Sequence, residues 1–182
     1  AVWQVNTYTV KFNANGGSGT TAQLACTYGQ GASLTANAFT RAGYAFVGWM
    51  TSANGTTVAY TDKQSVLNLS TQANATINLY ARWTDKWYVD AEARDDTNQG
   101  DSASQAFKTI QHAIDKSVEG MTIIVADGTY APINSGNKSI TIRSVNGAAR
   151  TIIDGGYPAA TNRCVYAGGN DGQTNTVIRG FT

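Results

Sequence analysis

The sequence is poor in the residues that build most catalytic and metal sites. In 182 residues it has one histidine, His112, and two cysteines, Cys26 and Cys164. A single histidine leaves one possible base for a serine or cysteine nucleophile, and its place in a helical segment favours a packing or solvent-facing role. The cysteines lie in different halves at unrelated spacing, so we expect two unpaired, partly buried thiols and no zinc site.

Charge is also scarce, and long apolar runs are absent. Thirteen basic and twelve acidic residues give a net charge of +1, and no run of lysine or arginine occurs. Without such a run there is no electrostatic footprint for nucleic acid, so no nucleic-acid partner is expected. No segment approaches the roughly 18 to 20 apolar residues that a spanning helix needs, so membrane insertion is not expected either.

The residues that are present divide the chain into two regions. All five leucines and all four tryptophans precede position 90, whereas ten of the eleven isoleucines follow it. The first 85 residues carry six charged side chains, while residues 90–101 alone hold five carboxylates. These shifts predict two domains with differently built cores, residues 1–85 and 86–182.

The first region has the pattern of a small, largely β module. Residues 8–13 alternate strand-favouring side chains and run into a glycine-rich turn at residues 15–19. Further short strands are predicted at residues 24–28, 44–50 and 76–83, with no helical period between them.

The second region opens with a strand at residues 87–90, an acidic turn at residues 95–101 and one amphipathic helix. Ser102 and Gln105 have the spacing of a capping box, and Gly120 stands where a helix C-terminal glycine belongs. The predicted apolar stripe consists of Phe107, Ile110, Ile114 and Val118.

Short β-branched segments follow that helix in rapid succession. They are predicted at residues 122–125, 140–142, 151–154, 164–166 and 176–178. Tight turns and the lack of intervening helices disfavour an alternating strand-and-helix sheet. A solenoid of stacked rungs or a sandwich fits better.

Three segments of the first region carry a family signature. YTVKFNANGG at residues 8–17, GYAFVGW at residues 43–49 and LYARW at residues 79–83 resemble the Listeria–Bacteroides repeat, the B-repeat of internalin-type surface proteins. This resemblance implies a compact β-grasp-like module of secreted and wall-attached bacterial proteins. Such a module acts as a spacer or partner-binding unit and brings no catalytic residues.

The second region is similar to another architecture. Residues 87–90, 106–115, 123–130 and 151–156 resemble the N-terminal cap and first rungs of a pectate-lyase-like right-handed parallel β-helix. This resemblance implies a helix covering the first rung, and catalytic groups on later rungs. Residues 179–182 end beside a strand without a closing segment, so we expect the natural protein to continue and the uncapped end to self-associate.

Two sets of side chains are candidate binding sites. Trp49, Tyr80 and Trp87 could stack on a sugar ring, although a small module also needs aromatic residues in its core. Calcium is the candidate metal, because hard cations prefer several oxygen ligands around a tight turn. The predicted calcium ligands are Asp95, Asp96 and Asp101, with a solvated turn as the alternative.

Paired carboxylates for glycoside cleavage have two candidates. Asp127 and Asp154 each precede a glycine, and this context favours turn roles over catalysis. No catalytic residue and no obligatory cofactor is therefore predicted.

Together these features predict a mainly β chain: a small β-grasp-like module, then a truncated right-handed parallel β-helix with one capping helix. The predicted function is that of a non-catalytic fragment of a bacterial secreted or cell-surface protein. It would serve as a spacer, adhesion or ligand-binding module toward an extracellular polysaccharide or protein. The alternative is the N-terminal targeting region of a polysaccharide lyase or glycoside hydrolase.

Overall fold

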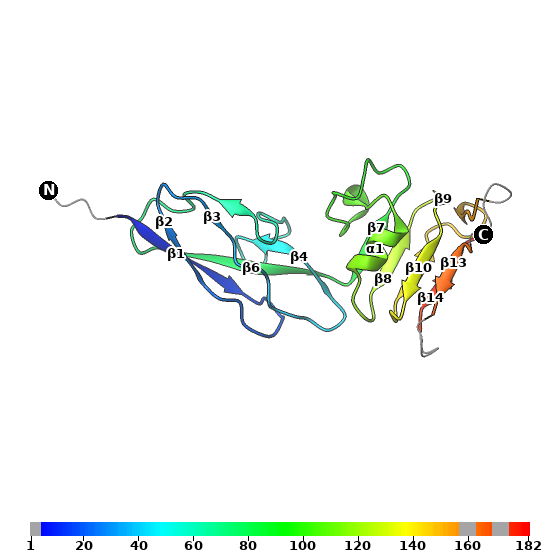
Figure 1. Cartoon of the computed structure of the whole chain (residues 1–182), viewed down its shortest axis with the longest axis horizontal. Helices are drawn as coiled ribbons and strands as arrows, with labels where there is room; N and C mark the ends of the chain where they lie inside the picture. The colour runs from blue at the N-terminus through cyan, green and yellow to red at the C-terminus, as the bar shows by residue number, and fades with distance from the viewer. Residues whose placement is uncertain (1–4, 157–162, 169–174) are drawn as a thin grey trace. The chain divides into compact units, whose positions relative to one another are not determined.

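The computed structural model describes residues 5–156, 163–168 and 175–182. It divides into two compact units. The first consists of Ala1–Ala42 with Phe46–Trp83, and the second of Gly43–Ala45 with Thr84–Thr182. Strands make up nearly all of the regular structure, so the chain is mainly β (Figure 1).

The first unit is built on a four-stranded sheet in the order β2-β1-β6-β4. These strands are β1 (Thr7–Asn13), β2 (Leu24–Thr27), β4 (Ala45–Met50) and β6 (Thr76–Thr84). β1 pairs antiparallel with β2 and parallel with β6. Two shorter strands, β3 (Ala32–Ser33) and β5 (Ser65–Val66), form a separate antiparallel pair.

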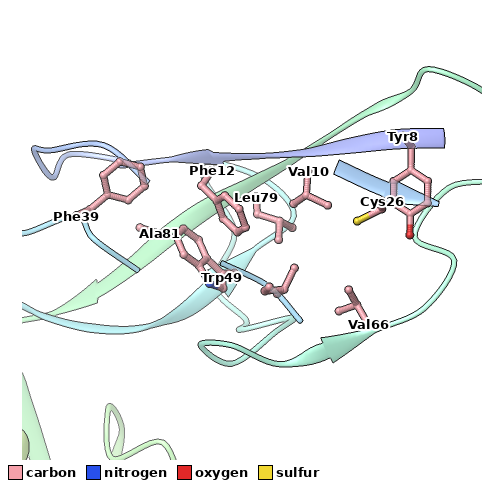
Figure 2. Close-up of a cluster of buried hydrophobic side chains, with 10 residues drawn as sticks. Tyr8, Val10, Phe12, Cys26, Phe39, Trp49, Val66, Leu79 and Ala81 are labelled. Carbon is pink, nitrogen blue, oxygen red and sulfur yellow. The ribbon is translucent and has the colours of Figure 1, made fainter. Parts of the chain in front are cut away.

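The core of the first unit is centred on Trp49, whose side chain is completely buried. The ring of Phe12 lies 4.7 Å from it between centroids, and that of Phe46 lies 4.8 Å away. Alternation in β1 supplies one side of this core, because Tyr8, Val10 and Phe12 face inward while the residues between them do not. Figure 2 shows Phe12 beside Trp49, with Tyr8 and Cys26 together at the other end of the cluster.

The glycine-rich turn after β1 and the tryptophan at the end of LYARW pack against each other. The Nε1–H of Trp83 donates to the Ala14 carbonyl at 2.9 Å. A Cβ added at Gly17 would lie 2.7 Å from the Trp83 ring and 2.9 Å from the Thr40 carbonyl oxygen, so only glycine fits there. The glycine at position 17 and the tryptophan at position 83 of the signature are therefore matched sterically.

The second unit contains three groups of strands, ordered β14-β11-β8-β7, β12-β9 and β10-β13. Every pairing between them is parallel. The strands are β7 (Lys86–Val89), β8 (Thr122–Val125), β9 (Gly128–Tyr130), β10 (Ile133–Gly136), β11 (Thr141–Ser144), β12 (Thr151–Ile153), β13 (Val165–Ala167) and β14 (Val177–Arg179).

The order of pairing in the second unit repeats along the chain. The successive strands β8, β9 and β10 pair with the successive strands β11, β12 and β13. In the largest sheet, Trp87, Ile123, Ile142 and Ile178 stand at one level of the register. The first three of these side chains are buried, so one apolar row crosses the sheet.

The single α-helix of the described residues is shorter than the sequence predicts. α1 spans Ile110–Lys116 and packs against β7, β8 and β10. The predicted start at Ser102 is wrong, since that side chain makes no capping bond and precedes only a 3-10 turn, η1 (Ala103–Gln105). Thr109 is the N-cap, and its hydroxyl accepts a hydrogen bond from the His112 N–H at 3.2 Å.

Pairing with a strand explains why the helix begins late. Phe107 donates its N–H to the Tyr88 carbonyl at 2.9 Å and accepts from the Asp90 N–H at 2.9 Å. These bonds hold Phe107 in an extended conformation beside β7, so tertiary pairing overrides the helical period. At the other end Val118 lies beyond the helix and is 41% exposed, so it does not belong to the apolar stripe.

Candidate functional site

The aromatic side chains predicted to stack on sugars occupy different environments. Trp49 is fully buried in the first unit, and Trp87 is 3% exposed in the second, where its ring lies 5.3 Å from that of Phe107. Neither ring presents a face to solvent, so the core role applies to both. Tyr80, on β6, is half-buried, and its role in ligand binding stays a prediction.

Asp96 anchors the segment that leads into α1. Its carboxylate accepts the N–H groups of Lys108 at 2.7 Å and Thr109 at 2.8 Å, and the Thr109 hydroxyl at 2.7 Å. Both oxygens are engaged in this way. The side chain thus ties the acidic turn to the residue that caps the helix.

Asp95 is used locally. It accepts from the backbone N–H of Thr97 at 2.8 Å and from the Thr97 hydroxyl, and these hydrogen bonds lower the pKa of the Asp95 carboxyl. Within the described residues, no three histidine, cysteine, aspartate or glutamate side chains come together to hold a metal. Asp95, Asp96 and Asp101 are therefore not gathered into a set of calcium ligands.

The two carboxylates considered for glycoside cleavage take turn roles. Asp127 accepts from the Asn146 amide at 2.9 Å and lies 3.4 Å from the Arg150 guanidinium. Asp154 accepts the Gly156 N–H at 2.8 Å, the pattern of an Asx turn. Asp154 is engaged within its own loop, whereas Asp127 joins its loop to the one that follows β11.

The two cysteines and the one histidine occupy different environments. Cys26 is buried in the first unit and Cys164 is exposed in the second. The prediction of unpaired thiols is confirmed, but Cys164 is more exposed than expected. His112 lies in α1 with its ring 4.6 Å from that of Phe107, which is a packing role.

Gln111 in α1 closes the free edge of β10. Its amide nitrogen donates to the Asn134 carbonyl at 3.1 Å, and its oxygen accepts the Asn134 N–H at 2.8 Å. The side-chain amide thus imitates a strand partner on the edge of β10 opposite β13. This role was not predicted, since Gln111 lies outside the predicted apolar stripe of the helix.

The outer edge of β7 is closed by main chain. Tyr88 donates its N–H to the Gly100 carbonyl at 2.8 Å, and the pairing with Phe107 extends this closure. A Cβ at Gly100 would lie 2.1 Å from the Phe107 ring, so glycine is required there. The loop before α1 therefore covers the backbone groups that an exposed strand would present to solvent.

Lys138 donates hydrogen bonds to the carbonyl groups at the C-terminal end of α1. Its ammonium group donates to the carbonyl oxygens of Ile114, Asp115 and Ser117, the last two at 2.9 Å. These carbonyls belong to the last turn and the C-cap, where the helix dipole favours a cation. The Ile114 carbonyl also accepts the Ser117 N–H at 3.1 Å. This contact links the helix to the turn after β10 across 21 to 24 residues of sequence, too far for any local pattern to predict.

Tyr130, in β9, holds the loop after β7 beside the end of β8. Its hydroxyl donates to the Ala126 carbonyl at 3.0 Å and accepts the Ala91 N–H at 3.1 Å. Burial raises the pKa of Tyr130 to about 12. Its neutral form is therefore the one that the folded state stabilises.

Comparison with known families agrees with the signature of the first unit. Residues 8–82 match the Listeria-Bacteroides repeat domain, and this span contains β2 to β5 and most of β1 and β6. No curated protein and no solved structure gives a significant match to the chain. In the described part of the chain, no helix has the length and apolar character to cross a membrane. Residues 8–82 thus form a Listeria-Bacteroides repeat domain, of a family typical of bacterial surface proteins.

Proposed function

We propose that this chain is a non-catalytic part of a bacterial secreted or cell-surface protein, with the repeat domain as a spacer or binding unit. The observation that carries the proposal is the match of residues 8–82 to a surface-protein repeat. The structure of that unit supports it, because its aromatic residues gather in a core around Trp49. Its side chains thus stabilise a compact module.

We propose further that the second unit forms the first turns of a right-handed parallel β-helix. Three observations support this: the strands pair in parallel, the pairing order repeats, and the backbone of Thr182 continues the ladder on β12. The N–H of Thr182 donates to Thr151 at 3.1 Å, and its carbonyl accepts from Ile153 at 3.0 Å. Each rung would then contribute one strand to each of three sheets.

The same parallel strands support a second candidate function, the N-terminal targeting region of a polysaccharide lyase or glycoside hydrolase. Asp127 and Asp154 are both engaged by loop residues, Asp127 by Asn146 of the loop after β11 and Asp154 by Gly156 of its own turn, so neither is offered as a catalytic group. In that function the chain would deliver a catalytic region to its substrate.

Assays of the full-length natural protein on acidic and neutral polysaccharides separate the two candidates, because the second candidate places the catalytic groups outside this chain. The favoured function predicts neither unsaturated products nor new reducing ends, with binding or display on a cell surface retained. Turnover that survives purification to homogeneity would overturn it.

Self-association through the last strands of the second unit is also proposed. In the described residues, β13 and β14 each have a strand partner on one side only. Unpaired strand edges favour pairing with another chain. Light scattering across a concentration series tests this, and a strict monomer at every concentration would contradict it.

A further inference from the structure

The outer face of the largest sheet in the second unit carries a row of four side chains at one level. The register places Tyr88, Ile124, Arg143 and Arg179 beside one another on β7, β8, β11 and β14. We call this the Tyr88–Arg179 row. Neighbouring residues on these strands, such as Ile123 and Ile142, are buried, so the row faces the opposite side of the sheet.

The arginine end of the row is open and positively charged. Arg143 and Arg179 are both exposed, and no carboxylate or hydrogen-bond partner for either occurs among the described residues. Adjacent strands lie about 4.8 Å apart, so two guanidinium groups at the same register reinforce each other's field. Two adjacent like charges without a counter-charge destabilise a sheet slightly, and an anionic partner would reverse this effect.

The other end of the row is apolar and hollow. The turn containing η1 leans over Tyr88 and Ile124 and leaves a cavity of about 110 Å³ between itself and the sheet. Ala103, Ala106 and Val145 also line it, and Val145 is 54% exposed. The space suits one aliphatic side chain.

We propose that the Tyr88–Arg179 row binds an acidic protein segment that has an apolar anchor residue. The anchor fills the hollow beside Tyr88 and Ile124, and carboxylates of the segment pair with Arg143 and Arg179. This inference deepens the proposed binding function and rests on it, because it assigns that function a face and a kind of partner.

Two observations favour a protein segment over an anionic sugar chain. The walls of the hollow are mainly aliphatic, whereas sugar rings bind best to an exposed aromatic face flanked by hydrogen-bonding groups. Charges of opposite sign also lie at opposite ends of the row. Asp90 borders the hollow and repels an acidic group there, so a partner must carry its apolar and acidic parts at different positions.

A random peptide display library selected on the full chain tests this proposal. Enriched peptides should combine an aliphatic residue with acidic ones, and synthetic copies should bind in fluorescence anisotropy. The double variant Arg143→Gln, Arg179→Gln should weaken binding by about tenfold or more, since charge-assisted pairs are lost. Val145→Ser should weaken it less. Both changes lie on exposed side chains, so thermal melting should be unchanged.

Lys116→Gln is the matched control, because it removes one exposed cation from the same unit away from the row. An equal loss of binding in this variant would overturn the proposal in favour of general charge attraction. So would a selection without acidic enrichment, or binding of polygalacturonate that depends on both arginines while peptides do not bind. If the peptide test fails and the full-length protein still turns over no polysaccharide, the proposed function stands without this inference.

Discussion

In the first unit apolar burial converges on Trp49, whereas in the second it is distributed along rows that cross parallel strands. Rings of Phe12, Phe39 and Phe46 surround the one indole, and β1, β4 and β6 all depend on it. In the second unit Ile142 stands in register with Ile123 on one side and with Ile178 on the other. We therefore expect a core centred on one side chain to unfold as a whole when that side chain is removed. The stability of stacked strands depends mainly on contacts between nearest neighbours.

The largest effect is expected from Trp49→Ala. Removing a buried tryptophan costs about 3–5 kcal/mol, which is most of the stability of a small module. We expect the first unit to unfold while the second keeps its own transition, as measured by calorimetry with far-ultraviolet circular dichroism. Tyr28→Ala, at a side chain 45% exposed, is the control and should leave both transitions in place. Simultaneous loss of both units would show that the cores are not separate.

Ile142→Ala should have the next largest effect, confined to the second unit. Truncating this buried isoleucine costs about 2–4 kcal/mol, and its row neighbours on β8 and β14 lose packing first. Hydrogen exchange should rise in β8, β11 and β14, with β1 to β6 unchanged. Ile152→Ala removes the same atoms from a side chain 40% exposed and should cost much less. Similar costs for the two variants would argue against a buried row.

Gln111→Ala should have a smaller, local effect. It leaves the N–H and carbonyl of Asn134 without their side-chain partner, at a cost of about 1 kcal/mol for each bond. The Asn134 amide should exchange faster while the helix remains. Gln111→Glu keeps the acceptor and loses the donor, so it should protect that amide better than alanine does. Equal exchange in all three proteins would contradict the edge-closing role.

The smallest effect concerns alkaline pH. The pKa of Tyr130 is raised to about 12 from its usual 10.0 because burial disfavours the phenolate. The unfolded chain therefore releases this proton first, and stability present below pH 10 is lost as pH rises toward 12. Tyr130→Phe should be less stable than wild type at neutral pH, and the gap should narrow across this window. A constant gap, or a tyrosine absorbance titration near the usual value, would contradict the assignment.

Patterns of neighbouring residues predicted most strands but not the contacts that position them. Strands at residues 8–13, 76–83 and 122–125 were found from alternation or β-branched runs, because that local signal matches the burial. The start of α1 was wrong, since Phe107 fits a helical stripe equally well but pairs with β7. Four short strands, β3, β5, β9 and β10, were missed because none of them contains a run of β-branched residues.

Candidate binding residues were harder to predict than strands. Trp49 and Trp87 were candidates for stacking on sugars because they are aromatic, and only the fold shows that both are buried. The arginines of the Tyr88–Arg179 row lie 36 residues apart in sequence, and only the strand register brings Arg143 beside Arg179. The carboxylates of the acidic turn resembled a metal site because several of them occur close together in sequence. Their hydrogen bonds to Thr97, Lys108 and Thr109 depend on the conformation of the loop, which local sequence patterns do not reveal.

The side-chain amide of Gln111 makes the two ends of the strand ladder in the second unit unequal. Because it occupies both hydrogen-bonding groups of Asn134, a further strand cannot add to β10 from the helix side without displacing it. The outer edge of β7 is likewise occupied by Gly100 and Phe107. In the described residues the outer edges of β13 and β14 stay open, so an extension of these two sheets would be added there and not beside β7 or β10.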